Sequence, residues 1–158
     1  KAAGLNVSQD DICYGIQKAS IPARLELISK EPLVFLDGAH NPNGAEAISS
    51  FMQNYSGQIT AVIGMMKDKN CDGFLAKVLK YCKSVITVTV KENPRTISAE
   101  ELSKLAKKYC SDVTVAEDYS QALNIAYTKS NGKEPLFVFG SLYLSGAIRE
   151  ELISKYNK

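Results

Sequence analysis

The stretch that decides the fold of this chain is Pro32-Leu33-Val34-Phe35-Leu36-Asp37-Gly38-Ala39-His40-Asn41-Pro42-Asn43-Gly44. Its apolar run, 33–36, is typical of a strand buried on both faces. An acid, a glycine, the only histidine of the chain and an Asn-Pro turn follow directly. An amphipathic helix is predicted next, because apolar residues recur at helical spacing from 48 to 55, and Asn43 and Glu46 have the spacing of a capping box. The stretch therefore predicts polar groups at the carboxyl end of a buried strand, facing the start of a helix.

Outward from this stretch, strands and helices alternate along the chain. Strands are predicted at 24–28, 59–64, 84–90, 113–115 and 136–139 from short apolar or β-branched runs. Helices are predicted between the later strands, with capping signals at Asn70, at Ser98 with Glu101, and at Asp118 with Gln121. Residues 29–31 are too few for a crossover, so 24–28 and 33–36 are expected to form an antiparallel hairpin. The pattern predicts an α/β fold: a doubly wound, mostly parallel sheet of about six strands, with one antiparallel strand at or near an edge and helices on both faces.

The chain is long enough for one domain with a core of its own, at 158 residues of which 45% are hydrophobic and 23% charged. Ser8 can cap a short helix over 9–19, and 20–22 indicates a linker because the residue before a proline disfavours helix. We expect residues 1–20 to be a helical tail or linker from a preceding domain, and 21–158 to be the domain proper. Because the chain starts at Lys1 without a methionine, we expect a fragment of a longer protein.

Composition argues against several classes of protein. The net charge of +2 is too small to indicate binding to nucleic acid or to an acidic membrane surface. No apolar run approaches the roughly 20 residues of a membrane span, and no signal peptide opens the chain. The four cysteines form no CxxC pair, which fits reduced, mostly buried thiols better than a disulfide or zinc framework. We therefore expect a cytoplasmic protein without nucleic-acid or membrane partners.

Four loops follow predicted strands, at 37–41, 67–70, 92–95 and 140–141. In a parallel sheet all four lie at one edge, which is where ligands bind in open α/β folds. The start of the helix after the first loop adds partial positive charge, which suits an anion. The chain has neither a GxGxxG nor a GxxxxGK[ST] motif, so a nucleotide would need a phosphate loop from another domain.

Each candidate residue in these loops also has a purely structural interpretation. Asp37 and His40 can form a helix-entry turn in which the imidazole bonds a backbone carbonyl. Ser141 can be a helix N-cap, since the chain has no second histidine for an acyl-transfer triad. The remaining candidates can be solvated surface charges: Lys67, Asp68, Lys69 and Arg95 in the loops, and Arg24 on the predicted edge strand at 24–28.

The segment Leu36-Asp37-Gly38-Ala39-His40-Asn41-Pro42 resembles the signature of the C-terminal domain of folylpolyglutamate synthetase and dihydrofolate synthetase, in the Mur-ligase superfamily. Mur ligases proper usually carry Tyr in place of Gly38, which favours the folate branch. Further matches run in family order over about residues 20–146, with Asn70 where the family often has an acid. These matches are Ala23-Arg24-Leu25-Glu26, Gly64-Met65-Met66-Lys67-Asp68-Lys69-Asn70, Asn93-Pro94-Arg95 and Gly140-Ser141-Leu142-Tyr143.

The resemblance implies a ligase that adds L-glutamate to folate through an acyl phosphate, using ATP and Mg²⁺. It implies that an N-terminal ATPase domain holds the phosphate loop, the magnesium and most of the folate site, and that no metal is bound by this chain. It implies catalytic roles for Asp37 and His40, a glutamate site made of these two residues and Ser141, and ATP contacts from Arg24 and Asn41. Lys67, Asp68, Lys69 and Arg95 would lie in cleft loops.

The resemblance leaves some points open. His40 can take a proton from the incoming amine or only orient it, and dihydropteroate can be a second substrate. We expect a monomer that is inactive without its ATPase domain. The alternative hypothesis is a stand-alone flavodoxin-like binding or regulatory domain.

Overall fold

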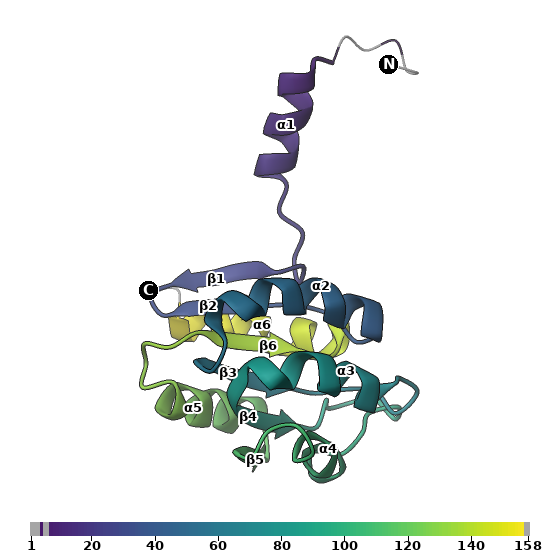
Figure 1. Cartoon of the computed structure of the whole chain (residues 1–158), viewed down its shortest axis with the longest axis vertical. Helices are drawn as coiled ribbons and strands as arrows, with labels where there is room; N and C mark the ends of the chain where they lie inside the picture. Colours follow the sequence, from purple (N-terminus) through teal and green to yellow (C-terminus); the bar gives the residue numbers. More distant parts are fainter. Residues whose placement is uncertain (1–3, 5–6, 157–158) are drawn as a thin grey trace.

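The computed structural model describes residue 4 and residues 7–156, and these form an α/β fold (Figure 1). Strands and helices alternate as the sequence predicts. In chain order the elements are α1 (Gln9–Lys18), β1 (Glu26–Lys30), β2 (Leu33–Leu36), α2 (Pro42–Met52), η1 (Gln53–Tyr55), β3 (Ile59–Ile63), α3 (Cys71–Val78), η2 (Leu79–Tyr81), β4 (Cys82–Val88), α4 (Ala99–Ala106), β5 (Val113–Ala116), α5 (Tyr119–Lys129), β6 (Leu136–Phe139) and α6 (Leu142–Tyr156).

The strands form one sheet in the order β1-β2-β6-β3-β4-β5. β1 pairs antiparallel with β2, and the other neighbours are parallel. The predicted hairpin, the antiparallel edge strand and the burial of the central strand are therefore confirmed. β6 lies between β2 and β3, so the last strand of the chain fills the gap left by the crossover from β2 to β3. This order differs from the strand order of flavodoxin-like domains, the class of protein in the alternative hypothesis.

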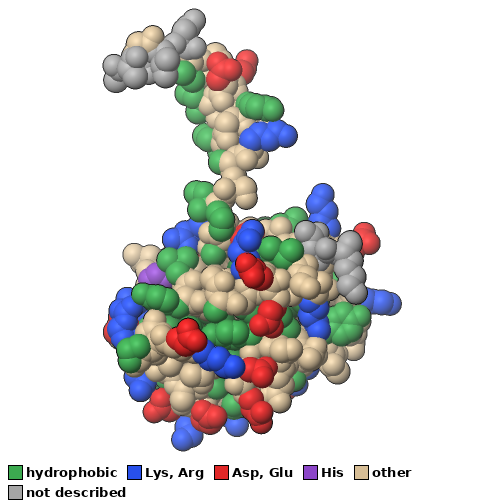
Figure 2. Space-filling model, turned by 180° about the vertical axis from the view of Figure 1, so that it is seen from behind, with side chains coloured by type: hydrophobic (Ala, Val, Ile, Leu, Met, Phe, Trp, Pro, Cys, Tyr) green, Lys and Arg blue, Asp and Glu red, His purple; other side chains and the backbone are tan. Residues whose placement is uncertain are grey.

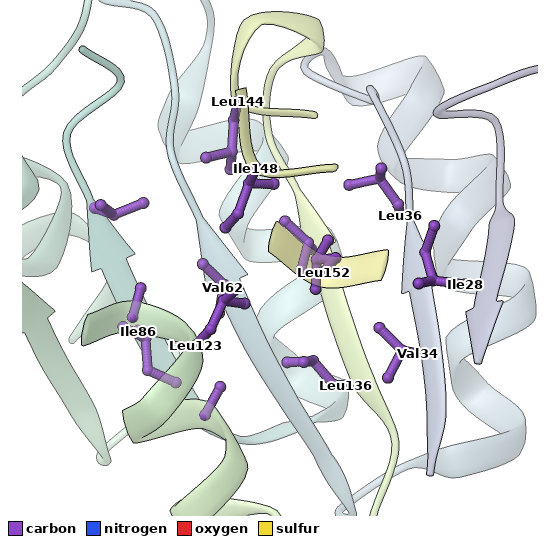
Figure 3. Close-up of a cluster of buried hydrophobic side chains, with 14 of the residues drawn as sticks. Ile28, Val34, Leu36, Val62, Ile86, Leu123, Leu136, Leu144, Ile148 and Leu152 are labelled. Carbon is purple, nitrogen blue, oxygen red and sulfur yellow. The ribbon is translucent and has the colours of Figure 1, made fainter. Parts of the chain in front are cut away.

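The sheet separates two cores, because neighbouring residues of a strand point to opposite faces. Val34 and Leu36 of β2 face the core beneath α5 and α6, shown in Figure 3, together with Leu136 of β6 and Leu152 of α6. Phe35 points the other way, toward the core beneath α2, α3 and α4. Both faces of β2 are thus covered, so the polar side chains of the loop 37–41 that follows it emerge at the carboxyl edge of the sheet.

The start of α2 differs from the sequence prediction. Asn41 is the N-cap, its side-chain oxygen accepting the Gly44 N–H at 2.8 Å, and Pro42 is the first helical residue. The predicted capping box of Asn43 and Glu46 is wrong, because a proline at the first position suits helix geometry and moves the start two residues earlier. Glu46 instead forms an ion pair with Lys77 of α3 at 3.0 Å.

Other boundaries shift by two residues or fewer. The strand predicted at 24–28 is β1, which lies two residues later in the chain. The strand predicted at 84–90 is β4, which lies two residues earlier. Ser98 and Glu101 form the predicted capping box of α4. The second predicted box is only half formed: Asp118 caps α5, but the Gln121 side chain accepts from the Glu117 N–H.

α1 stands off the body of the molecule on the linker that follows it (Figure 1). Ser8 caps it as predicted, and none of its residues is buried. On the face seen in Figure 2, acidic and basic side chains are interspersed over the body. Among the residues described, no helix combines the length and apolarity that crossing a membrane requires. Cys71 and Cys110 are buried free thiols, whereas Cys13 is exposed.

Candidate functional site

The loop after β2 and the turn before β1 enclose an open hollow of about 250 Å³ at the carboxyl edge of the sheet. Four residues predicted from sequence come together here, Arg24, Asp37, His40 and Asn41. The hollow is lined by these four and by Leu25, Gly38, Ala39, Gly44, Ala47 and Ile48.

Asp37 is the structural centre of this region. Its N–H donates to the Val138 carbonyl at 2.9 Å, which continues the ladder between β2 and β6 for one residue. One carboxylate oxygen accepts the Leu25 N–H at 2.7 Å, and the other accepts the Ala39 N–H at 2.6 Å. The side chain therefore joins the loop after β2 to the turn before β1. Each oxygen still has a second lone pair that a ligand could use.

The turn at 22–25 has an unusual backbone. Ala23 and Leu25 have φ values of 57° and 42°, in the left-handed region that costs roughly 1–2 kcal/mol for a residue with a side chain. The Ala23 carbonyl accepts the Gly38 N–H at 2.8 Å, so the turn is bonded to the loop after β2 at two points. Arg24 lies between these positions with an exposed side chain, and its Nη1 donates to the Ala23 carbonyl at 3.1 Å.

His40 lies half-buried at the mouth of the hollow, and Figure 2 shows the imidazole at the surface. Its Nδ1 is 2.9 Å from the Gly38 carbonyl oxygen. A carbonyl only accepts hydrogen bonds, so Nδ1 carries the proton in this contact. In the neutral ring Nε2 is then left as an acceptor. The carbonyl bond of the structural interpretation is thus present, and the other ring nitrogen stays available.

Gly38 is needed for the packing of the loop. A Cβ atom at this position would overlap the Leu142 side chain and lie 3.0 Å from Arg24 Nη1. The tyrosine that Mur ligases carry here would require both side chains to lie elsewhere.

Ser141 lies beside the hollow and is not among the residues that line it. The two loops are joined, because the Gly140 N–H donates to the Ala39 carbonyl at 2.9 Å. Ser141 itself is buried, and its hydroxyl accepts the Tyr143 N–H at 3.0 Å at the start of α6. This is the capping role of the structural interpretation, and a part in glutamate binding stays a prediction.

The predicted cleft residues of the loops after β3 and β4 form a second group outside the hollow. The Lys67 N–H donates to the Arg95 carbonyl at 2.7 Å, which ties the two loops together. Asp68 lies 3.2 Å from Lys69 Nζ and 3.8 Å from Arg95 Nη1. The hydrogen bond from Lys69 is the main reason why the pKa of Asp68 is below its usual value. The group is exposed and carries both signs of charge.

Sequence reasoning assigned no role to three residues that the structure connects to the predicted site residues, although two of them, Glu26 and Tyr143, stand in quoted family matches. Tyr143 accepts a hydrogen bond from Arg95 Nη2 at 3.0 Å, and the guanidinium lies over its ring. Glu26 and Arg149 form an ion pair behind the turn at 22–25. Tyr143 belongs to a quoted family match, so its place after Ser141 was a usable signal. Nothing local in the sequence connects Glu26 with Arg149.

No group of three or more His, Cys, Asp or Glu side chains is arranged to hold a metal ion within the described part of the chain. Such a cluster would hold a metal by protein ligands alone, whereas magnesium is usually held by one or two carboxylates together with water and phosphate oxygens.

Comparison with known proteins assigns the fold. The chain is 32% identical over 155 residues to dihydrofolate synthase/folylpolyglutamate synthase of Escherichia coli K12, covering 95% of this chain and 35% of that protein. A structure of E. coli FolC in complex with DHPP and ADP superposes with a TM-score of 0.85 at 29% identity, covering 98% of this chain and 36% of that one.

A second solved structure is a bifunctional folylpolyglutamate synthase/dihydrofolate synthase with Mn, AMPPNP and L-glutamate bound. It has a TM-score of 0.80 at 27% identity, covering 95% of this chain and 36% of that one. The chain thus spans about a third of the length of these proteins. The family model for the C-terminal domain of dihydrofolate synthetase matches residues 22–151. This chain therefore belongs to the dihydrofolate synthetase C-terminal domain family.

Proposed function

We propose that this chain is the C-terminal domain of an ATP-dependent ligase that adds L-glutamate to folate. The observation that carries the proposal is the pairing of a family match over 22–151 with an open half-site that holds Arg24, His40 and Asn41 at the carboxyl edge of the sheet. The solved relatives described above bind ADP or AMPPNP, and one of them binds L-glutamate.

The proposal includes a division of the chain. Residues 1–20 would be a helical tail or linker from the preceding ATPase domain, and 21–158 the glutamate-ligase domain. The ATPase domain would bring the phosphate loop, the magnesium and most of the folate site. We place the enzyme in the cytoplasm as a monomer, in folate and one-carbon metabolism. The exposed loops at Lys67–Lys69 and Arg95 would face the ATPase domain across the cleft.

The proposed reaction has two steps. The γ-phosphoryl group of ATP is transferred to a carboxylate of the folate, which releases ADP and leaves an acyl phosphate. The amine of glutamate then attacks the acyl carbon, the amide bond forms and inorganic phosphate leaves. Mg²⁺ bound with the nucleotide would neutralise phosphate charge. The ligase needs donors for phosphate oxygens, a partner for the amine and a closed site that excludes water.

The residues of the hollow suit parts of this chemistry. The Arg24 guanidinium is exposed at the rim and can donate to phosphate oxygens, and Asn41 caps the helix whose N-terminus also favours an anion. The Nε2 atom of His40 is an acceptor for the ammonium of glutamate, or for its proton. Asp37 adds negative charge near the ammonium while holding the loop. Ser141 would contribute from beside the hollow.

The first test is to compare the 158-residue chain with the full-length enzyme. We expect the full-length enzyme to form ADP in a reaction that requires both glutamate and a folate. We expect the chain alone to fold, to show no turnover and to bind ATP at about millimolar Kd or more weakly, since one arginine supplies only part of the roughly 4 kcal/mol that millimolar binding needs. Ligase turnover by the purified chain alone would refute the division of the site.

The second test concerns His40 in the full-length enzyme. We expect His40→Ala to keep the melting temperature near that of the wild type, because the side chain is half-buried and leaves no core cavity. Loss of one charge-assisted contact or one proton transfer should raise the glutamate KM or lower kcat by about 10- to 1000-fold. ATP KM should change much less. Normal kinetics with a clearly lowered melting temperature would show that His40 is only a turn residue.

A further inference from the structure

We propose that Arg149 of α6 is a positioning residue for Arg24, acting through Glu26 and the backbone of Ala23. The inference rests on the proposed function, since it assigns Arg149 to the nucleotide step of that ligase. Arg149 lies on the last helix, does not line the hollow and would otherwise be counted as a surface charge.

The chain of contacts from Arg149 to the turn is continuous. The Arg149 Nε donates to both carboxylate oxygens of Glu26, at 3.0 and 3.1 Å, and its Nη2 donates to Oε1 at 2.6 Å. The same carboxylate accepts the Ala23 N–H, through Oε2 at 2.9 Å. Fork-like guanidinium–carboxylate pairs fix both distance and orientation. Glu26 is therefore held in one place and in turn holds the backbone one residue before Arg24.

The pair is better shielded than the ion pairs of the outer loops. The Glu26 side chain is 11% exposed and that of Arg149 38%. The hydrogen bond from Arg149 is the largest cause that keeps the pKa of Glu26 below its usual value. The carboxylate therefore stays ionised at neutral pH, and its bond to Ala23 stays charge-assisted.

The turn needs such support because its conformation is strained. Residues on both sides of Arg24 have positive φ, and such residues persist only where the surroundings determine them. Asp37 holds the second of them through the Leu25 N–H, from inside the hollow. Glu26 and Arg149 hold the first from the opposite side, through the Ala23 N–H. Arg24 is thus carried by a turn that is clamped at both ends.

An ordinary stabilising ion pair would be equally visible in the structure, so the test has to separate stability from positioning. The chain offers a matched control in the pair of Lys83 and Glu134, whose side chains are 32% and 30% exposed. This pair joins β4 to the segment before β6 and does not line the hollow. Glu134→Gln should lower stability without changing the nucleotide kinetics.

The experiment measures ATP KM, kcat and melting temperature in the full-length ligase, with glutamate and tetrahydrofolate as substrates. Four variants are compared with the wild type: Arg24→Met, Arg149→Met, the double variant and Glu134→Gln. We expect Arg24→Met to raise ATP KM by about 10- to 100-fold, as loss of a charged contact does. Arg149→Met should raise it by about 3- to 10-fold, and by less than 2-fold when Arg24 is already Met, because the two act as a unit.

Each result decides between the possibilities. Equal ATP KM for Arg149→Met and the wild type, with Arg24→Met impaired, would overturn the positioning role and leave the proposed function intact. Independent effects that multiply in the double variant would also overturn it. A wild-type enzyme without glutamate-dependent ADP formation would overturn the proposed function and this inference together. If Arg149→Met does not fold, Arg149→Lys keeps the charge but loses the fork, and should raise ATP KM about 3-fold.

Discussion

Two groups of loops at the same edge of the sheet are built in different ways. The inner loops, 22–25 and 37–41, are joined by the buried carboxylate of Asp37, which accepts backbone N–H groups of both loops and belongs to a residue only 8% exposed. The outer loops, 67–70 and 92–95, are joined by one backbone bond and by the ion pair of Asp68 with Arg95, and the Asp68 side chain is 43% exposed. A buried charge-assisted bond contributes much more to stability than an exposed ion pair.

The difference fits the two-domain ligase that we propose. The inner loops hold the backbone around Arg24 and His40 in place, which suits residues whose side chains must meet a reacting phosphate or amine. The outer loops carry exposed charges that can exchange partners when another domain approaches. The same edge thus combines a rigid half-site with an adjustable rim.

The largest expected effect comes from changing the carboxylate that joins the inner loops. Asp37→Asn puts an amide NH₂ against a backbone N–H and removes the negative charge, so it should lower the free energy of unfolding by about 3 kcal/mol. Urea unfolding of the 158-residue chain measures this. The matched change in the outer loops, Asp68→Asn, should leave the free energy of unfolding nearly unchanged, because an exposed ion pair contributes little to stability. Equal losses for the two variants would contradict the contrast between the loops.

The next effect depends on pH and concerns Glu26. Its folded pKa is below the unfolded value, so its stabilising contribution is fully present above the usual pKa near 4.5 and is lost as the pH falls through the folded pKa. Glu26→Gln should therefore lower the free energy of unfolding by about 1–2 kcal/mol at pH 7. The loss is smaller than for a fully buried pair because Arg149 is partly exposed.

The measurement is the melting temperature of the wild type and of Glu26→Gln, from pH 7 down to the acid limit of the wild type. The two proteins share all other carboxyl groups, so the titration of those groups cancels in the difference. The difference between the two melting temperatures should shrink steadily below pH 4.5. A gap that stays constant to the lowest pH would show that the charge of Glu26 contributes nothing.

Most of the fold was predictable from local patterns. The run at 33–36 predicts a strand covered on both faces, and the short connection after β1 predicts the hairpin. The start of α2 was missed because Asn41 and Asn43 are both good capping residues, and only the proline between them decides. That signal was present in the sequence and favours Asn41.

The candidate site was predictable only in part. Asp37, His40 and Asn41 were expected at one edge of the sheet, and Arg24 was added only by the family resemblance; all four line one hollow. The Asp37 carboxylate accepts the Leu25 N–H only because of the conformation of the turn at 22–25, which residue propensities do not predict. The bond between Glu26 and Arg149 joins residues 123 positions apart in the chain, so only the packing of α6 on the sheet brings them together.

A smaller effect is expected at Gly38. The Cβ of Gly38→Ala would overlap the end of the Leu142 side chain, which is exposed enough to move. The loss of stability should therefore be about 1 kcal/mol, as for a modest overpacked site. In the full-length ligase, ATP KM should rise more than the stability loss suggests, because Arg24 Nη1 is also displaced. An ATP KM equal to that of the wild type would contradict this reason.

The smallest expected effect is at Ala23, and it tests the strain in the inner loops directly. Ala23→Gly removes a left-handed penalty of about 1 kcal/mol, since glycine adopts positive φ freely. The change also removes a buried methyl group and makes the unfolded chain more flexible, which together cost about the same. Stability should stay within about 0.5 kcal/mol of the wild type. The matched control is Ala126→Gly in α5, a buried alanine with helical geometry, where nothing offsets the loss and about 1–2 kcal/mol should disappear. If chemical unfolding shows the same loss for both variants, the turn at 22–25 is not strained. The turn would then not need the bonds on either side of Arg24 to keep its conformation.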